Sequence, residues 1–124
     1  MRLMEFVVII TCREVTNFFE WRGHAASAIK GGLSQEIVAA VADGRRPLRM
    51  AEDEDIVYNF TTELLKNKGV SDATYARTVA KFGEEGVIDI IGISGYYNLI
   101  GLAMNVAHTP GGEGAEPALV PLPR

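Results

Sequence analysis

Apolar residues recur at the spacing of an α-helix along most of the chain. In residues 51–68, for example, Ile56, Phe60 and Leu64 fall on one helical face. No stretch alternates apolar and polar residues for long enough to predict a strand. The pattern therefore predicts an all-α fold.

Start and stop signals divide this pattern into about six helices. Asn17, Ser34 and Ser71 can each cap a helix N-terminus, and glycines such as Gly44 and Gly69 follow helix ends. The expected helices cover residues 2–14, 18–30, 35–43, 51–68, 72–82 and 85–106. The β-branched pair Val15-Thr16 is expected to separate the first two.

The C-terminal end has a different composition. Residues 109–124 hold four of the five prolines, together with three glycines. Such a segment cannot continue a helix and orders only when it lies against another surface. We therefore expect one helical domain, residues 1–108, followed by an extended Pro/Gly-rich tail, residues 109–124.

Composition narrows the choice of partners. Hydrophobic residues make up 48% of the 124 positions, which is high for a small domain and predicts a homo-oligomer. The net charge of −4 provides no basic patch for a phosphate backbone, so nucleic acid is excluded as an expected partner. A small-molecule substrate remains the expected ligand.

Two apolar segments require a check for targeting or membrane insertion. The run from Phe6 to Cys12 is short and is followed by Arg13 and Glu14, so it does not predict a signal peptide. Residues 88–107 are long enough to span a membrane, but their asparagines, tyrosines and glycines favour a core or interface helix. We expect a cytoplasmic protein that does not enter a membrane.

The strongest local pattern for chemistry lies at the start of the second helix. Asn17, Glu20 and His24 share one helical face, and Glu20 can reach His24 across one turn. A carboxylate beside an imidazole orients the ring and forms a plausible proton-transfer unit. The alternative is structural, because Asn17 and Glu20 also fit a capping box.

Other polar residues carry weaker signals. Trp21, Tyr96 and Tyr97 can line a binding pocket, although packing explains aromatic residues equally well. Arg22 is expected to point away from His24, as a surface residue. The acidic run from Glu52 to Asp55 is typical of a helix start and lacks accompanying histidine ligands, so we expect no metal and no cofactor.

Several motifs resemble the carboxymuconolactone decarboxylase family, which includes AhpD-like proteins. The resemblance covers residues 2–107 and rests on these motifs: Arg2-Leu3-x-Glu5, Glu20-Trp21-x-x-His24, Gly32-Leu33-Ser34, Glu63-Leu64-Leu65, Val70-Ser71-Asp72, Phe82-Gly83 and Gly95-Tyr96-Tyr97. It implies an AhpD-like helical bundle that assembles as a trimer or hexamer.

The resemblance also implies which residues form the site. The family's acid and histidine match Glu5 and His24, whereas Asn17 and Glu20 occupy the positions of its redox CxxC pair. Cys12 is the sole cysteine, so the chain has no dithiol for a peroxidase cycle. The implied catalytic residues are Glu5, Glu20 and His24, with Asn17, Trp21, Tyr96 and Tyr97 as substrate-binding candidates.

Three functions remain open at this stage. The first is a decarboxylase-like lyase that transfers protons on a small carboxylated or lactone-like molecule. The second is a catalytically inactive, oligomeric helical binding module. The third is an alkylhydroperoxidase-like oxidoreductase, the peroxiredoxin activity common in the family, which the missing CxxC pair disfavours. Convergence of Glu5 with His24 in one polar pocket is expected for the first function.

Overall fold

The computed structural model describes residues 1–111 and 117–121. These residues form helices and no strand, which confirms the all-α prediction. There are five: α1 (Arg2–Val15), α2 (Phe18–Lys30), α3 (Gln35–Ala42), α4 (Glu52–Asn67) and α5 (Asp72–Val106). The two helices expected at 72–82 and 85–106 form one element, α5, which kinks at Gly83. Gly83 has φ 72°, a value that glycine adopts without the steric penalty of a Cβ.

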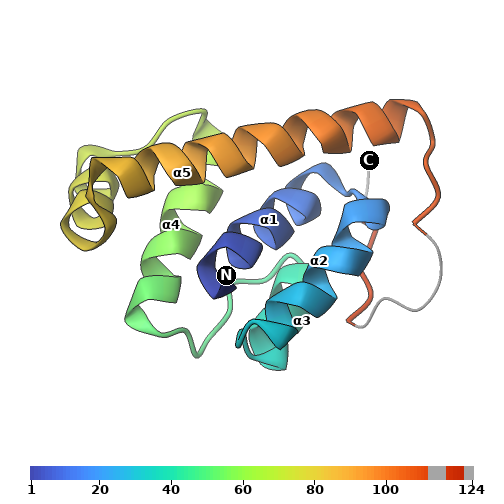
Figure 1. The fold of residues 1–124 in the computed structure, drawn as a ribbon, viewed down its shortest axis with the longest axis horizontal. Coiled ribbons are helices and arrows are strands. Elements are labelled where there is room, and N and C mark those ends of the chain that lie inside the picture. The colour runs from blue at the N-terminus through green and yellow to red at the C-terminus, as the bar shows by residue number, and fades with distance from the viewer. Residues whose placement is uncertain (112–116, 122–124) are drawn as a thin grey trace.

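Helix α1 lies at the centre of the fold (Figure 1). It packs against each of the other four helices, with α5 crossing over it along the top of Figure 1. Every residue from Glu5 to Arg13 is buried, so α1 has no solvent-facing side over this stretch. This position explains the continuous apolar run, and it forces Glu5 into the interior.

The predicted N-caps are confirmed. The Asn17 side chain accepts hydrogen bonds from the backbone N–H groups of Phe19 and Glu20. Ser34 and Ser71 do the same for α3 and α5. These bonds satisfy backbone donors that a helix start leaves unpaired.

The link between α1 and α2 is a tight turn at Thr16. Thr16 adopts the left-handed conformation with φ 54°, which is unusual for a β-branched residue. The Asn17 N–H donates to the Cys12 carbonyl at 2.9 Å, and Arg13 Nη2 donates to Thr16 Oγ1 at 3.0 Å. These bonds hold the turn and bring α2 back alongside α1.

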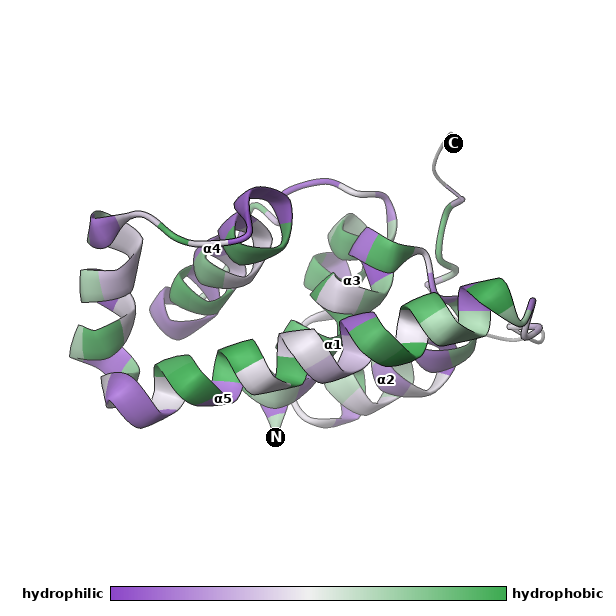
Figure 2. Cartoon of the chain, turned by 90° about the horizontal axis from the view of Figure 1, so that it is seen from above, coloured by the Kyte–Doolittle hydropathy of each residue, from purple (hydrophilic) through white to green (hydrophobic). Residues whose placement is uncertain are grey.

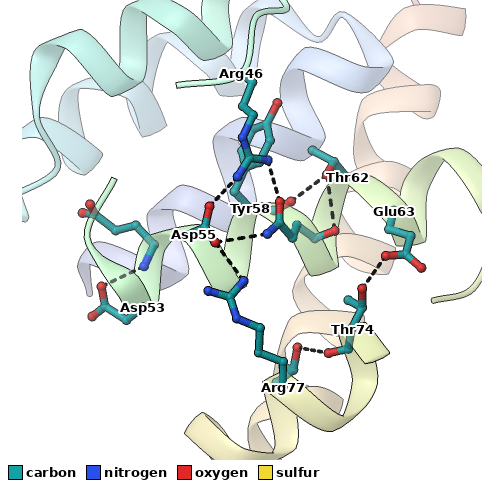
Figure 3. A network of polar contacts seen from close by, with 11 residues as sticks. Arg46, Asp53, Asp55, Tyr58, Thr62, Glu63, Thr74 and Arg77 are labelled. Carbon is teal, nitrogen blue, oxygen red and sulfur yellow. Dashed lines mark hydrogen bonds and ion pairs between the residues drawn. The ribbon is translucent and has the colours of Figure 1, made fainter. Parts of the chain in front are cut away.

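The acidic start of α4 has partners that the helix-dipole interpretation did not include. Arg2 pairs with Asp53 and Glu54, tying the start of α1 to α4. Asp55 lies between Arg46 and Arg77, and it therefore connects α4 to the preceding loop and to α5 (Figure 3). Arg46 and Arg77 are exposed, so their pairs with Asp55 contribute little stability alone, whereas Glu54 is buried beneath Arg2.

The described part of the C-terminal segment packs on α2 and α3. Trp21 Nε1 donates to the Pro117 carbonyl at 2.8 Å, and the Val120 N–H donates to the Ala42 carbonyl at 3.3 Å. Leu119 is buried in the core. The remainder of the predicted tail, residues 112–116 and 122–124, lies outside the described residues.

Candidate active site

Glu5 and His24 meet where α1 and α2 lie side by side. His24 Nδ1 is 2.7 Å from Glu5 Oε2, and only 7% of the Glu5 side chain is exposed. An unpaired carboxylate at such a depth is costly because it has lost its hydration. The imidazole supplies the partner that stabilises Glu5, and Glu5 in turn fixes the orientation of the ring.

Glu20 completes the cluster from the outer side. His24 Nε2 is 3.1 Å from Glu20 Oε2, one helical turn away on α2. The capping-box interpretation of Glu20 is wrong, because the Asn17 N–H that Glu20 would accept already donates to Cys12 O. The carboxylate of Glu20 therefore pairs with the histidine. We call Glu5, His24 and Glu20 the triad.

The triad brings both ring nitrogens of one imidazole close to carboxylates. A neutral imidazole has one N–H donor and one acceptor nitrogen, and an ionised carboxylate only accepts. Both ring nitrogens of His24 lie at hydrogen-bond distance from carboxylate oxygens. Nδ1 makes a hydrogen bond to Glu5, and Nε2 meets Glu20 at ion-pair distance. The cluster therefore places two carboxylates around one imidazole, an arrangement suited to proton transfer.

Two tyrosines of α5 extend the cluster. The ring of Tyr97 meets His24 edge-on, with 5.0 Å between ring centroids, and Tyr96 meets Tyr97 in the same way at 5.3 Å. Burial raises the pKa of Tyr97, and the charges of Glu20 and Glu5 add to this effect. Tyr97 is therefore held as a neutral phenol against the imidazole. Three helices thus contribute to the site.

The other two proposed binding residues lie elsewhere. Both polar atoms of Asn17 have partners, since Oδ1 caps α2 and Nδ2 lies 3.6 Å from Met104 Sδ. Trp21 is 1% exposed in the core, where its N–H bonds to the C-terminal segment. The structure thus places Asn17 and Trp21 as supports of α2. It brings Tyr97 to the triad, and Tyr96 reaches the triad only through Tyr97.

A surface depression of about 540 Å³ opens on the outer side of the triad. It is lined by Phe19, Glu20, Arg22, Gly23, His24, Ala26, Pro110 and Gly111. Glu5 lies behind His24 and is not part of this lining. A ligand in the depression would therefore meet Glu20 and His24 directly, and Glu5 only through the imidazole.

Arg22 is the lining residue that the sequence analysis placed on another side of α2. Its exposed side chain borders the depression beside Glu20 and His24. A long arginine side chain can reach around a helix surface, which simple helical spacing does not capture. Pro110 and Gly111 were not foreseen because they reach the depression from the far end of the chain.

Cys12 lies on the inner side of this site. Burial raises its pKa to about 12, and the nearby charges of Glu20 and Glu5 act in the same direction. A thiol with that pKa is not a thiolate at neutral pH, and thiol chemistry requires the thiolate. Cys12 is therefore a small apolar core residue.

No family model, curated protein or solved structure matches this chain. The site is consequently interpreted from its own geometry. A larger depression of about 660 Å³ lies between α1, α4 and α5, but its lining is apolar apart from Asp89. The depression over the triad is smaller, yet it combines a histidine, a carboxylate and an arginine.

Proposed function

We propose that this chain is a carboxymuconolactone decarboxylase-like protein, with an AhpD-like helical bundle and without the redox cysteines of the peroxidase branch. Support comes from the positions that the family resemblance assigns to acid and histidine. Glu5 and His24, far apart in the sequence, lie 2.7 Å apart in the structure. Asn17 and Glu20 stand where the redox cysteines would be.

The triad would act as a proton-transfer site on a small carboxylated or lactone-like molecule. The observation that carries this proposal is that both imidazole nitrogens of His24 contact carboxylates, at 2.7 Å and 3.1 Å. Glu5 orients the ring and balances its charge from the buried side. His24 and Glu20, which face the depression, exchange the proton with the substrate.

Decarboxylation of a lactone acid fits this arrangement. When the carboxylate leaves as CO₂, the electron pair of the broken C–C bond enters the conjugated lactone as an enolate. The triad supplies the proton that converts this enolate into product. Solvent, or the carboxylic acid of the next substrate, then returns a proton to the triad. Arg22 stands beside the site with a positive charge suited to a second carboxylate.

One observation favours the alternative of a catalytically inactive binding module. Both nitrogens of His24 already have partners within the chain, as in a purely structural polar cluster. Under this alternative the depression binds a ligand without chemistry. The peroxidase alternative has the least support, because Cys12 is buried and its pKa is about 12.

Carboxymuconolactone and simpler butenolide carboxylates provide the test. CO₂ release and deuterium uptake from D₂O would be followed by NMR for the wild type, His24→Gln and Glu20→Gln. The enzyme proposal expects turnover by the wild type and at least a 100-fold loss in His24→Gln, in line with general acid–base catalysis. Cys12→Ala is the matched control and should retain turnover.

The outcomes separate the candidates. Saturable binding of these lactone acids with no turnover in any variant would support the binding module. Turnover that survives His24→Gln would refute the triad as its source. A hydroperoxide-reducing activity abolished by Cys12→Ala would favour the peroxidase alternative.

A further inference from the structure

Helix α5 is apolar on the side that faces away from the core. Residues spaced alternately four and three apart form an outer stripe, which is Ile88, Gly92, Gly95, Leu99, Leu102 and Val106. The four large members are 51–82% exposed. Figure 2 shows hydrophobic residues recurring along the whole second half of α5. A helix that is apolar all round is normally buried on all sides, so this stripe lacks its covering partner in the single chain.

The stripe has a regular relief. A Cβ added at Gly92 or Gly95 would meet no atom within 4 Å, so the two glycines form an open notch in the helix surface. Leu99 and Leu102 project beyond it on the same face. The order of the stripe is symmetric about residue 97, since glycine and leucine positions lie at equal distances on either side.

We propose that this stripe binds the same stripe of a second copy, with the two α5 helices antiparallel and a two-fold axis level with residue 97. In this register Leu99 of each copy enters the space over Gly95 of the other. Leu102 enters the space over Gly92, and Val106 meets Ile88. Each leucine is thus received by a glycine, which is the complementarity that close helix packing requires.

The adjoining apolar groove supports this register. Ile88 and Gly92 also line the 660 Å³ depression between α1, α4 and α5. The second copy places Leu102 and Val106 at this end of the stripe, so their side chains cover the groove. With Ile91 and Tyr96, the stripe exposes on the order of 700 Å², close to the about 800 Å² that each partner contributes to a standard interface.

A membrane is the competing occupant, and the charges argue against it. By length and composition α5 is apolar enough to cross a membrane, and 22% of its most apolar window is buried. However, residues 82–107 contain no lysine or arginine, while Glu84, Glu85 and Asp89 are acidic. Helices that lie on anionic lipid surfaces carry basic residues on their polar face.

The pairing would also connect the two triads. Tyr96 lies one residue from the level of the two-fold axis. The two copies of Tyr96 therefore lie close to the axis, on the same face of the helix pair. Each Tyr96 ring contacts Tyr97, whose ring contacts His24. Tyr96 is 58% exposed in the single chain and becomes covered in the pair. This interface holds whether or not the triad is catalytic.

Gly95→Leu provides the first test, read by light scattering after gel filtration. The wild type should have twice the 13.5 kDa chain mass, or a higher even multiple such as a hexamer. Gly95→Leu fills the notch that receives Leu99 and should lower the association constant at least tenfold. Because leucine favours helix over glycine and nothing lies near this position, the helical content of the variant should not fall.

Two companion variants make the first test specific. Gly95→Leu combined with Leu99→Ala restores space in the partner, so association should return. Ala80→Leu adds the same side chain at an exposed position before the kink and should leave the mass unchanged. A wild-type monomer or trimer would overturn the proposal. So would a monomer that floats with mixed phosphatidylcholine and phosphatidylglycerol vesicles, and Gly95→Leu should then float equally well.

Cysteine cross-linking tests the antiparallel register. Ile88→Cys combined with Val106→Cys should form disulfide-linked dimers on mild oxidation, because these positions face each other. Either single variant should not, since two copies of position 88 would lie about 27 Å apart along the helix. The native Cys12 is buried and does not interfere. Efficient cross-linking of a single variant would indicate parallel helices and overturn the proposal.

Discussion

His24 Nδ1 lies 2.7 Å from Glu5 Oε2, joining residues that are 19 positions apart. This contact joins the most buried helix of the fold to the rim of a surface depression. It depends on the turn at Thr16, which returns α2 alongside α1, and on the burial of α1, which leaves Glu5 little access to bulk water. The two glutamates of the triad consequently differ in their environment.

This difference predicts unequal costs for removing them. Glu5→Ala leaves the inner nitrogen of His24 without a partner in the interior and should lower the free energy of unfolding by about 1–3 kcal/mol. Glu20→Ala removes a partly exposed i,i+4 pair and should cost less than about 1 kcal/mol. Urea denaturation monitored by circular dichroism gives both values. Glu14→Ala, at an exposed position of α1, is the control.

Equal losses for the two alanine variants would contradict the burial difference. Glu5→Gln separates charge from hydrogen bonding, because the amide retains an acceptor and the size of the side chain. It should recover part of the stability lost in Glu5→Ala. A Gln variant no better than the Ala variant would mean that the charge, rather than the hydrogen bond, is the essential feature.

The buried thiol of Cys12 should make the folded protein less stable at alkaline pH. Its pKa is raised from 9.0 to about 12 in the fold by burial, so above pH 9 the unfolded chain loses the thiol proton first. The contribution of Cys12 to stability is complete below pH 9 and is lost as the pH rises toward 12. Cys12→Ala should therefore give a flatter stability curve than the wild type between pH 9 and 12.

A matching reactivity measurement checks the same residue. The native thiol should resist a disulfide reagent at neutral pH and react only after unfolding in denaturant. Rapid modification of the folded protein would contradict the burial of Cys12. The raised pKa of Tyr97 also lowers stability at alkaline pH, but it does so equally in the wild type and in Cys12→Ala. It therefore does not affect the comparison between them.

The parts of the site that sequence analysis anticipated are those set by helical geometry. Glu20 and His24 are four residues apart on one helix, and that spacing alone places them in contact. The inward position of Glu5 follows from its neighbours on the helix, which are apolar. Its contact with His24 needed the family spacing in addition, since helical periodicity does not specify how two helices are placed against each other.

Long-range contacts were the part that escaped prediction. Nothing local to Trp21 indicates that its N–H meets the Pro117 carbonyl, and nothing near the acidic start of α4 indicates Arg2 as its partner. Glu20 was assigned to a capping box because the sequence fits one. The actual partner of the Asn17 N–H is Cys12 O, an acceptor supplied by the turn at Thr16.

At Gly101, helix α5 packs closely against Val15 and Asn17, next to the site. A Cβ added there would lie 2.5 Å from Val15 Cγ2 and 3.4 Å from Asn17 Nδ2. Because the side chain of valine is stiff, Gly101→Ala should destabilise the fold by about 1–3 kcal/mol despite the better helix propensity of alanine. Thermal unfolding measures the change. Gly23→Ala, where nothing lies within 4 Å, should be neutral or stabilising.

A second substitution tests the cause of that loss. Val15→Ala removes the methyl group that the new Cβ would meet, so it should cost less in the Gly101→Ala background than in the wild type. The two changes are thus expected to be non-additive, as contacting residues usually are. Strict additivity would show that the loss arises elsewhere.

The exposed guanidinium of Arg22 leads to the last prediction, which rests on the proposed function. Arg22 borders the depression beside Glu20 and His24, while it is no partner of the triad in the described contacts. It should hold a substrate carboxylate without taking part in proton transfer. Arg22→Ala should therefore raise KM for a lactone dicarboxylate several-fold with little change in kcat.

Arg22→Lys keeps the charge and should recover part of the loss, and added salt should narrow the difference between wild type and variant. Arg45→Ala removes an exposed arginine that pairs with Asp43 and should leave both constants unchanged. A fall in kcat with an unchanged KM would instead place Arg22 in the chemical step.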